Sequence, residues 1–114
     1  MKPDKAAFEP GILVDHGEGR YSLTYDKFPN FSNVFDPKGL QGGGYTWHGL
    51  VATLMTETAP DALEAIDFDP EAGMFVAVSE DLDALMEVAK ALRQLEKRDV
   101  VERIVATTDL REYD

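Results

Sequence analysis

The sequence predicts an α+β domain with two layers, in which a small and mostly antiparallel sheet carries helices packed mainly on one face. Three observations support this prediction. Apolar and polar side chains alternate near the N-terminus, an apolar run occupies residues 74–78, and helical periodicity covers much of the chain from residue 47 onward. A chain of 114 residues with 44% hydrophobic side chains can bury one core, so we expect residues 1–114 to form a single domain.

The first predicted element is a β-hairpin. Residues 20–26 alternate apolar and polar side chains, which is the period of a half-buried strand, and residues 11–16 contain a second apolar run. The intervening residues 16–19 include two glycines, which permit the positive φ angles of a tight hairpin turn. We expect residues 1–10, before this hairpin, to be mobile.

Residues 27–45 are expected to form an irregular loop, with a short strand at residues 33–35 as the alternative. They contain Pro29, the turn-like run 36–39 and three consecutive glycines at 42–44. Such a long connection is often functional, or it contains an element that local patterns do not reveal.

Two helices are predicted after this loop. Pro60 is placed in the first turn of the second, a short helix that extends to Ile66, and the first ends near Ala59. The first helix has one apolar stripe with the spacing i, i+3, i+4, i+7 and i+8, formed by Trp47, Leu50, Val51, Leu54 and Met55.

The second half of the chain predicts a turn, a strand and two further helices. Residues 67–73 are rich in turn formers, and residues 74–79 are expected to be the central strand because their side chains are apolar on both faces. Ser79 is placed to cap a helix that has Glu80 and Asp81 in its first turn and an apolar stripe from Leu82 to Leu95, and a last helix follows at 99–105.

The chain is strongly acidic, and its charge is unevenly distributed. It has 22 acidic and 11 basic residues, a net charge of −11, and residues 39–89 carry ten acids and no Lys or Arg. Such a segment would attract a cation-rich partner, or it would simply keep the protein soluble. Because clustered bases are absent, nucleic acid is not an expected partner.

No catalytic, cofactor-binding or metal-binding constellation stands out. The chain has no cysteine, which excludes disulfides and thiolate sites. His16 lies in the predicted hairpin turn and His48 in the first turn of a helix, and we expect neither to be catalytic. Residues 67–71 are similar to the start of a calcium loop, but Ala72 and Val78 stand where that loop needs Gly and a bidentate Glu.

The sequence also predicts the compartment and the placement of the aromatic residues. Without an apolar signal-peptide core or a run of about 20 apolar residues, a cytoplasmic protein with no membrane partner is expected.

Trp47 is in register with the buried stripe, whereas Tyr45 is a candidate for an exposed aromatic anchor. Gly49 weakens its helix, which suggests that a neighbour packs against it too closely for a side chain.

Two stretches together are similar to a known family. Residues 41–51 contain a Gly-Tyr-x-Trp helix start, and residues 66–75 contain an Asp-x-Asp-Pro-Glu-x-Gly turn before an apolar strand. With the hairpin and the C-terminal helices, the chain resembles the immunity protein 51 family over roughly residues 11–108. This family consists of bacterial immunity proteins that neutralise toxins of polymorphic or contact-dependent inhibition systems.

The resemblance implies a non-enzymatic protein that stays in the toxin-producing cell, binds a cognate toxin domain and needs no cofactor. It also implies that some motif residues are structural marks of the fold, namely Gly44, Tyr45, Trp47, Asp67, Asp69 and Gly73. Many such toxins are nucleases with basic clefts, which an acidic segment would fit in place of phosphates. The candidate toxin-binding residues are Asp61, Glu64, Asp67, Asp69, Glu71, Glu80, Asp81, Asp83 and Tyr45.

Two other functions remain open from the sequence. One is a general acidic protein-interaction module without a toxin partner. The other is a small hydrolytic enzyme, which would need a concave pocket that holds a carboxylate of raised pKa beside His16 or His48.

Overall fold

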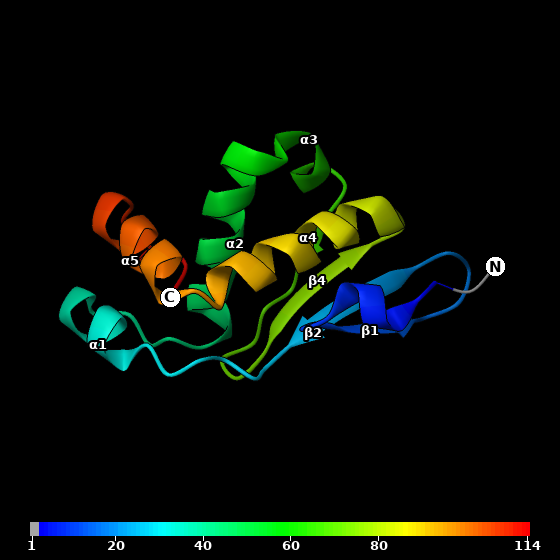
Figure 1. Cartoon of the computed structure of the whole chain (residues 1–114). Coiled ribbons are helices and arrows are strands. Elements are labelled where there is room, and N and C mark those ends of the chain that lie inside the picture. The colour runs from blue at the N-terminus through cyan, green and yellow to red at the C-terminus, as the bar shows by residue number, and fades with distance from the viewer. Residues whose placement is uncertain (1–2) are drawn as a thin grey trace.

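A four-stranded antiparallel sheet forms one layer of the protein in the computed structural model, which describes residues 3–114. Its strand order is β1-β2-β4-β3, with β1 (Ile12–Asp15), β2 (Tyr21–Tyr25), β3 (Asp67–Phe68) and β4 (Phe75–Ser79). Helices α2 (Gly44–Thr58) and α4 (Leu82–Leu95) lie over one face of this sheet (Figure 1). The predicted α+β class, the hairpin and the central position of the strand near 74–79 are confirmed.

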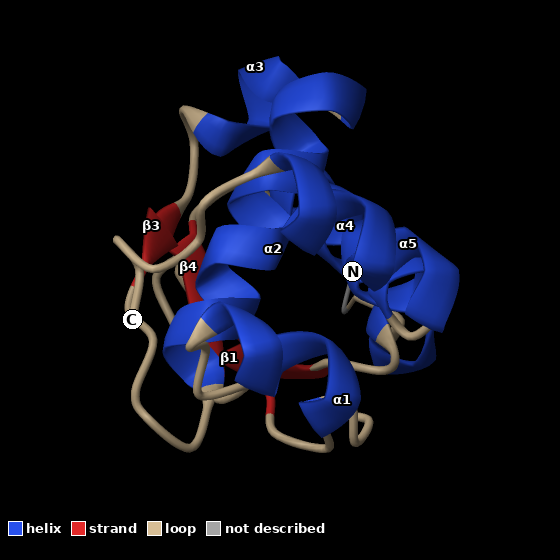
Figure 2. Cartoon of the chain, turned by 90° about the vertical axis from the view of Figure 1, so that its left-hand side faces the viewer, coloured by secondary structure: helices blue, strands red, loops and turns tan. Residues whose placement is uncertain are grey.

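The remaining helices are short or lie toward the ends of the molecule. They are η1 (Lys5–Phe8), α1 (Ser32–Phe35), η2 (Asp36–Lys38), α3 (Pro60–Leu63) and α5 (Arg98–Thr107). Figure 2 shows α3 and α1 at opposite ends of the α2 helix, with β3 and β4 to its left. Among residues 3–114, no helix lies over the opposite face of the sheet (Figure 1).

The strand register shows which side chains face the helices. Leu13 pairs with Leu23, Leu23 with Ala77, and Ala77 with Phe68, so these four side chains share one face. The imidazole of His48 on α2 stacks on the Phe68 ring at 4.6 Å between centroids, which identifies this face as the one that packs on the helices.

Trp47 lies at the centre of the core, as predicted. Its side chain is 0% exposed, stacks on Phe28 and meets the ring of Tyr25 edge-on, each at 5.4 Å between centroids. Its indole Nε1–H has no hydrogen-bond acceptor among the described residues. The chain contains a single tryptophan, so its fluorescence reports directly on this core.

The long connection at residues 27–45 is more regular than the sequence indicated. It contains α1 and η2, and α1 buries Phe35 against the core. A one-turn helix is too short to leave a periodic pattern in the sequence. The stability of α1 comes from the contact of Phe35 with the core. Toward the N-terminus, residues 1 and 2 of the segment expected to be mobile lie outside the described residues, while η1 buries Phe8.

Two further local expectations were wrong. Residues 67–73 are not simply a turn, since Asp67–Phe68 form the edge strand β3. The N-cap of α4 is Asp81 rather than Ser79, whose hydroxyl instead accepts the backbone N–H of Asp81 at 2.9 Å. Ser79 and Asp81, two positions apart, can each accept such a bond, so the sequence alone did not decide between them.

The glycines of α2 are required by close packing. A Cβ atom on Gly44 would lie 1.9 Å from the carbonyl oxygen of Glu71, and one on Gly49 would lie 2.7 Å from the ring of Tyr113. The backbone N–H of Gly44 also donates to the carbonyl of Ala72 at 3.0 Å. The N-terminus of α2 therefore sits directly on the β3–β4 turn, which brings the two motif stretches together.

Candidate functional site

All eight candidate acids are exposed, and they come from three places in the fold. In the described part of the chain, none of them forms an ion pair with a basic side chain. Asp61 lies on α3 and Glu64 directly follows it. The others lie along the β3–β4 hairpin and at the start of α4, namely Asp67, Asp69, Glu71, Glu80, Asp81 and Asp83.

The hairpin register places three of these acids on one side of the sheet. Asp67 lies opposite Val78, and Glu71 forms a bridge with Met74, so the antiparallel pairing continues beyond β3. Asp69 lies between them in the same register, and its backbone N–H bonds to β4 at 3.0 Å. Alternate residues of an extended strand share a face, so Asp67, Asp69 and Glu71 form one row. We call this row the acidic edge.

The acidic edge meets the acids at the start of α4 at one end of the sheet. A shallow pocket of about 290 Å³ is lined by Asp67 together with Glu80 and Asp81. Arg20, from the β1–β2 hairpin, lines the same pocket and supplies a positive charge there. The structure thus joins acids that are 13 to 14 residues apart in the sequence, and the strand pairing is the reason.

Asp81 has a structural role as well as an exposed charge. Its carboxylate accepts the backbone N–H groups of Asp83 and Ala84, at 2.9 and 3.4 Å, and so caps α4. Asp83 lies in the first turn of the same helix, where the helix dipole favours a negative charge.

Tyr45 is the partly exposed aromatic residue among the candidate toxin-binding residues. It lies in the first turn of α2, and its side chain is 38% exposed. Thr46, the next residue, is fully buried and donates its hydroxyl hydrogen to the carboxylate of Asp114 at 2.6 Å. Tyr45 is therefore held on a firmly packed turn.

The face of the sheet opposite α2 and α4 is uncovered, and we call it the open face. Ile12 lies opposite Thr24 and Val14 opposite Ser22, so these side chains point away from the helices. The pairing of β2 with β4 extends the same two rows across the sheet. The open face is formed by Ile12, Val14, Ser22, Thr24, Val76 and Val78.

Neither histidine lies in a pocket of the kind that a hydrolase needs. His16 lies on the open face, where its Nε2 atom is 2.8 Å from the hydroxyl oxygen of Ser22. Ser22 is only 5% exposed, and no third side chain in the described residues orients the imidazole of His16. Burial lowers the pKa of His48, so this imidazole is neutral as it stacks on Phe68. The Ser22–His16 contact was not predicted, since it depends on the hairpin register.

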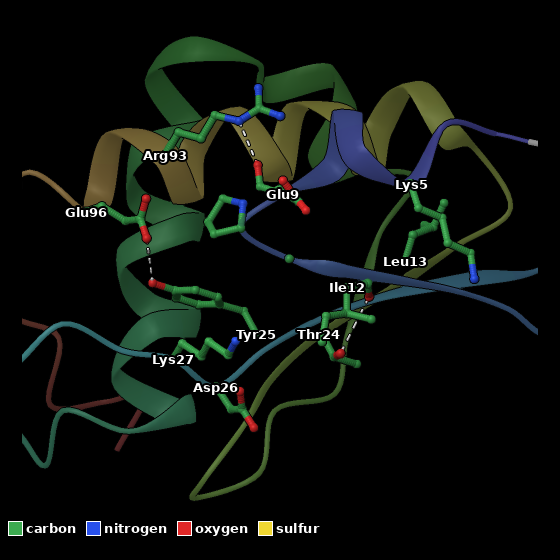
Figure 3. A pocket seen from close by; sticks show the side chains of 12 residues that line it. Lys5, Glu9, Ile12, Leu13, Thr24, Tyr25, Asp26, Lys27, Arg93 and Glu96 are labelled. Carbon is green, nitrogen blue, oxygen red and sulfur yellow. Dashed lines mark hydrogen bonds between the residues drawn. The ribbon is translucent and has the colours of Figure 1, made fainter.

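A pocket of about 580 Å³ lies between η1, the β1–β2 hairpin and α4, and neither histidine lines it (Figure 3). The Tyr25 hydroxyl donates to the carboxylate of Glu96 at 3.3 Å, and Arg93 Nε donates to the carbonyl of Glu9 at 2.7 Å. Burial, followed by the neighbouring negative charge of Glu96, raises the pKa of Tyr25 well above its ordinary value. The Tyr25 phenol is therefore a hydrogen-bond donor and not a base. Three acidic and three basic side chains line this pocket, namely Glu9, Asp26, Glu96, Lys5, Lys27 and Arg93.

Residues 3–114 contain neither a cluster of metal ligands nor a membrane-spanning helix. No cluster of three or more His, Asp or Glu side chains is placed to hold a metal ion there. Across the same residues, no helix has both the length and the apolar character that a membrane span requires.

The fold and the site define a small α+β protein whose two distinctive surfaces are the acidic edge and the open face. A family model described as immunity protein 51 matches residues 12–109 of the chain. The chain belongs to the immunity protein 51 family. No curated protein and no solved structure matches it. Family membership supports an immunity role, as the two motif stretches predicted, and these stretches contact each other at Gly44.

Proposed function

We propose that this protein binds a cognate toxin domain with a basic surface, such as that of a nuclease, and neutralises it in the cytoplasm. Family membership carries the immunity role, and the exposure of eight acids without basic partners supports the electrostatic part. None of these acids is ion-paired within residues 3–114, so their charges remain available to an incoming partner, although Arg20 shares the pocket of Asp67, Glu80 and Asp81. The protein acts by binding and not by catalysis.

The toxin-binding surface is centred on the acidic edge and extends to Glu80 and Asp81 around the shared pocket. Tyr45, partly exposed beside the β3–β4 turn, adds an aromatic contact of the kind that anchors interfaces. Asp61, Glu64 and Asp83 contribute to the long-range field. Association is therefore fast at low salt and slows as the salt concentration rises.

The test is co-expression with the toxin domain encoded by the neighbouring upstream gene, scored by survival of the host and by co-purification. The wild-type protein should rescue growth and co-purify. The triple variant D67K/D69K/E71K should fail to rescue, with an association rate reduced about tenfold or more at low salt.

A matched variant controls for net charge. D36K/D99K/E112K reverses three exposed acids that make no side-chain hydrogen bond or ion pair among the described residues, and it should still rescue. If the two triple variants behave alike, the acidic edge is not the binding surface. If the wild-type protein does not rescue, the immunity role is wrong and the general interaction module becomes the better hypothesis.

A further inference from the structure

The open face exposes apolar surface that no helix or strand of residues 3–114 covers. Ile12 is 59% exposed and Val14 is 36% exposed. In the described residues only one other large hydrophobic side chain, Tyr45, is exposed to this degree. Two of these three side chains, Ile12 and Val14, thus lie on the same face of one short strand.

These side chains belong to a mixed patch. Two rows cross β1, β2 and β4, namely Ile12–Thr24–Val76 and Val14–Ser22–Val78, and both valines of β4 are half-buried. Neighbouring strands lie about 4.8 Å apart, so Thr24 and Ser22 separate the aliphatic side chains of β1 from those of β4. Ser22 is 5% exposed, and its hydroxyl oxygen lies 2.8 Å from His16 Nε2, so a hydrogen-bonded polar pair lies within this patch. Exposed apolar side chains rimmed by polar residues are typical of a protein interaction site.

The rim of the patch carries a charge that selects its partner. Asp67 lies opposite Val78, and Asp69 and Glu71 continue the acidic edge along the same side of the sheet. Arg20 is the basic residue that shares the pocket at the end of this row. The patch therefore fits a protein surface that presents an apolar centre with basic residues beside it. A second copy of this chain is a poor fit, because it would carry the same net charge of −11.

The edge strand excludes one alternative mode of binding. Pro70 lies between Asp69 and Glu71, whose backbone N–H groups bond to β4. The position of Pro70 therefore faces away from the sheet, where it offers no N–H to an added strand. A partner is thus directed onto the open face and the side chains of the acidic edge, and not onto the backbone of β3.

We propose that the open face is the apolar centre of the toxin interface and that the acidic edge is its charged rim. This inference rests on the proposed function and specifies its surface. Four short strands present about 250 Å² of sheet, compared with about 800 Å² per partner in a standard interface. The toxin therefore contacts both the open face and the acidic edge, and the two contribute differently to binding.

The experiment separates the two contributions by kinetics. I12T/V14T keeps β-branched side chains, and so the strand propensity, but removes apolar contact from the open face. Binding of the purified upstream-encoded toxin domain is measured at 0.05 and 0.5 M NaCl. We expect I12T/V14T to dissociate about tenfold faster, with the salt dependence of the wild type. D67K/D69K/E71K should instead associate more slowly and lose that salt dependence.

The matched control is V100T, the same chemical change at a half-buried position of α5, remote from the sheet. It should bind as the wild type does, and Trp47 fluorescence checks that each variant is folded. If I12T/V14T is folded and binds like the wild type, the open face lies outside the interface. If it instead converts a wild-type dimer to a monomer in sedimentation, the face serves self-association and the proposal is wrong. If the wild-type protein does not bind the toxin, the proposed function fails first and this inference fails with it.

Discussion

At the scale of single residues, Gly44 is the position where the two halves of the family motif meet. A Cβ atom there would overlap the carbonyl oxygens of Glu71 and Met74, at 1.9 and 2.2 Å. We predict that Gly44→Ala lowers the free energy of unfolding by about 3 kcal/mol, because backbone must move to admit the methyl group. Urea unfolding followed by Trp47 fluorescence measures this change.

Gly73 provides the control for this substitution. It lies in the same β3–β4 turn, but a Cβ atom there would have no neighbour within 4 Å, and its φ angle is not positive. Gly73→Ala should therefore change the free energy of unfolding by less than about 1 kcal/mol. If both variants lose the same free energy of unfolding, the loss comes from the reduced flexibility of the β3–β4 turn and not from the contact of Gly44 with that turn.

His48 makes stability depend on pH. Burial lowers its pKa in the folded protein, so the unfolded chain binds more protons in the range just below pH 6.5. This contribution to stability is complete above pH 6.5 and is lost as the pH falls toward the folded-state pKa of His48. We predict that His48→Gln loses less stability than the wild type between pH 7 and 5.5 in urea unfolding. Parallel losses would contradict this assignment.

At the scale of the elements, the cap of α4 shows how one acid can have a structural and a binding role. The two hydrogen bonds that the Asp81 carboxylate accepts leave its charge exposed to solvent. We predict that Asp81→Ala lowers the free energy of unfolding by about 1 kcal/mol, whereas Asp81→Asn, which keeps an acceptor, loses only a few tenths. Thermal unfolding followed by circular dichroism measures both.

Asp83→Ala is the reference for this pair, since Asp83 accepts no hydrogen bond among the described residues and contributes through the helix dipole alone. A loss in Asp81→Asn as large as in Asp81→Ala would assign the effect to charge and not to capping. Asp81→Asn also allows toxin binding to be measured without the negative charge in a protein of nearly unchanged stability.

At the scale of the whole molecule, self-repulsion within a chain of net charge −11 opposes folding. The radius of gyration is 13.5 Å, so charges on opposite sides of the molecule lie farther apart than the Debye length of about 8 Å at physiological salt, and added salt screens much of this repulsion. We predict that the melting temperature rises by several degrees between 0.02 and 0.3 M NaCl.

The variant D61K/E64K tests whether net charge is the cause. Each replacement adds two charges, which changes the net charge from −11 to −7, and both side chains are exposed on or beside α3. Its melting temperature should depend less on salt than that of the wild type. An unchanged dependence would indicate specific ion binding in place of general screening.

Much of the architecture could be predicted because it is encoded in local patterns. Period-two alternation identified β2, apolar runs identified β1 and β4, and the helical stripe placed Trp47 in the core. The motif stretches identified the family. The one-turn helix α1 and the two-residue strand β3 could not be predicted, since their residues adopt these shapes only through tertiary contacts.

The sequence by itself determined the fold class, the family and the acidity of residues 39–89, since each depends on residue type and spacing along the chain. Only the tertiary structure decided which acids lie together and which apolar side chains stay uncovered. The register of β3 on β4 aligned Asp67, Asp69 and Glu71, and the packing of α2 and α4 on one face left Ile12 and Val14 exposed on the other. The physical reason is that a strand has two faces, and which one is covered depends on how distant segments pack.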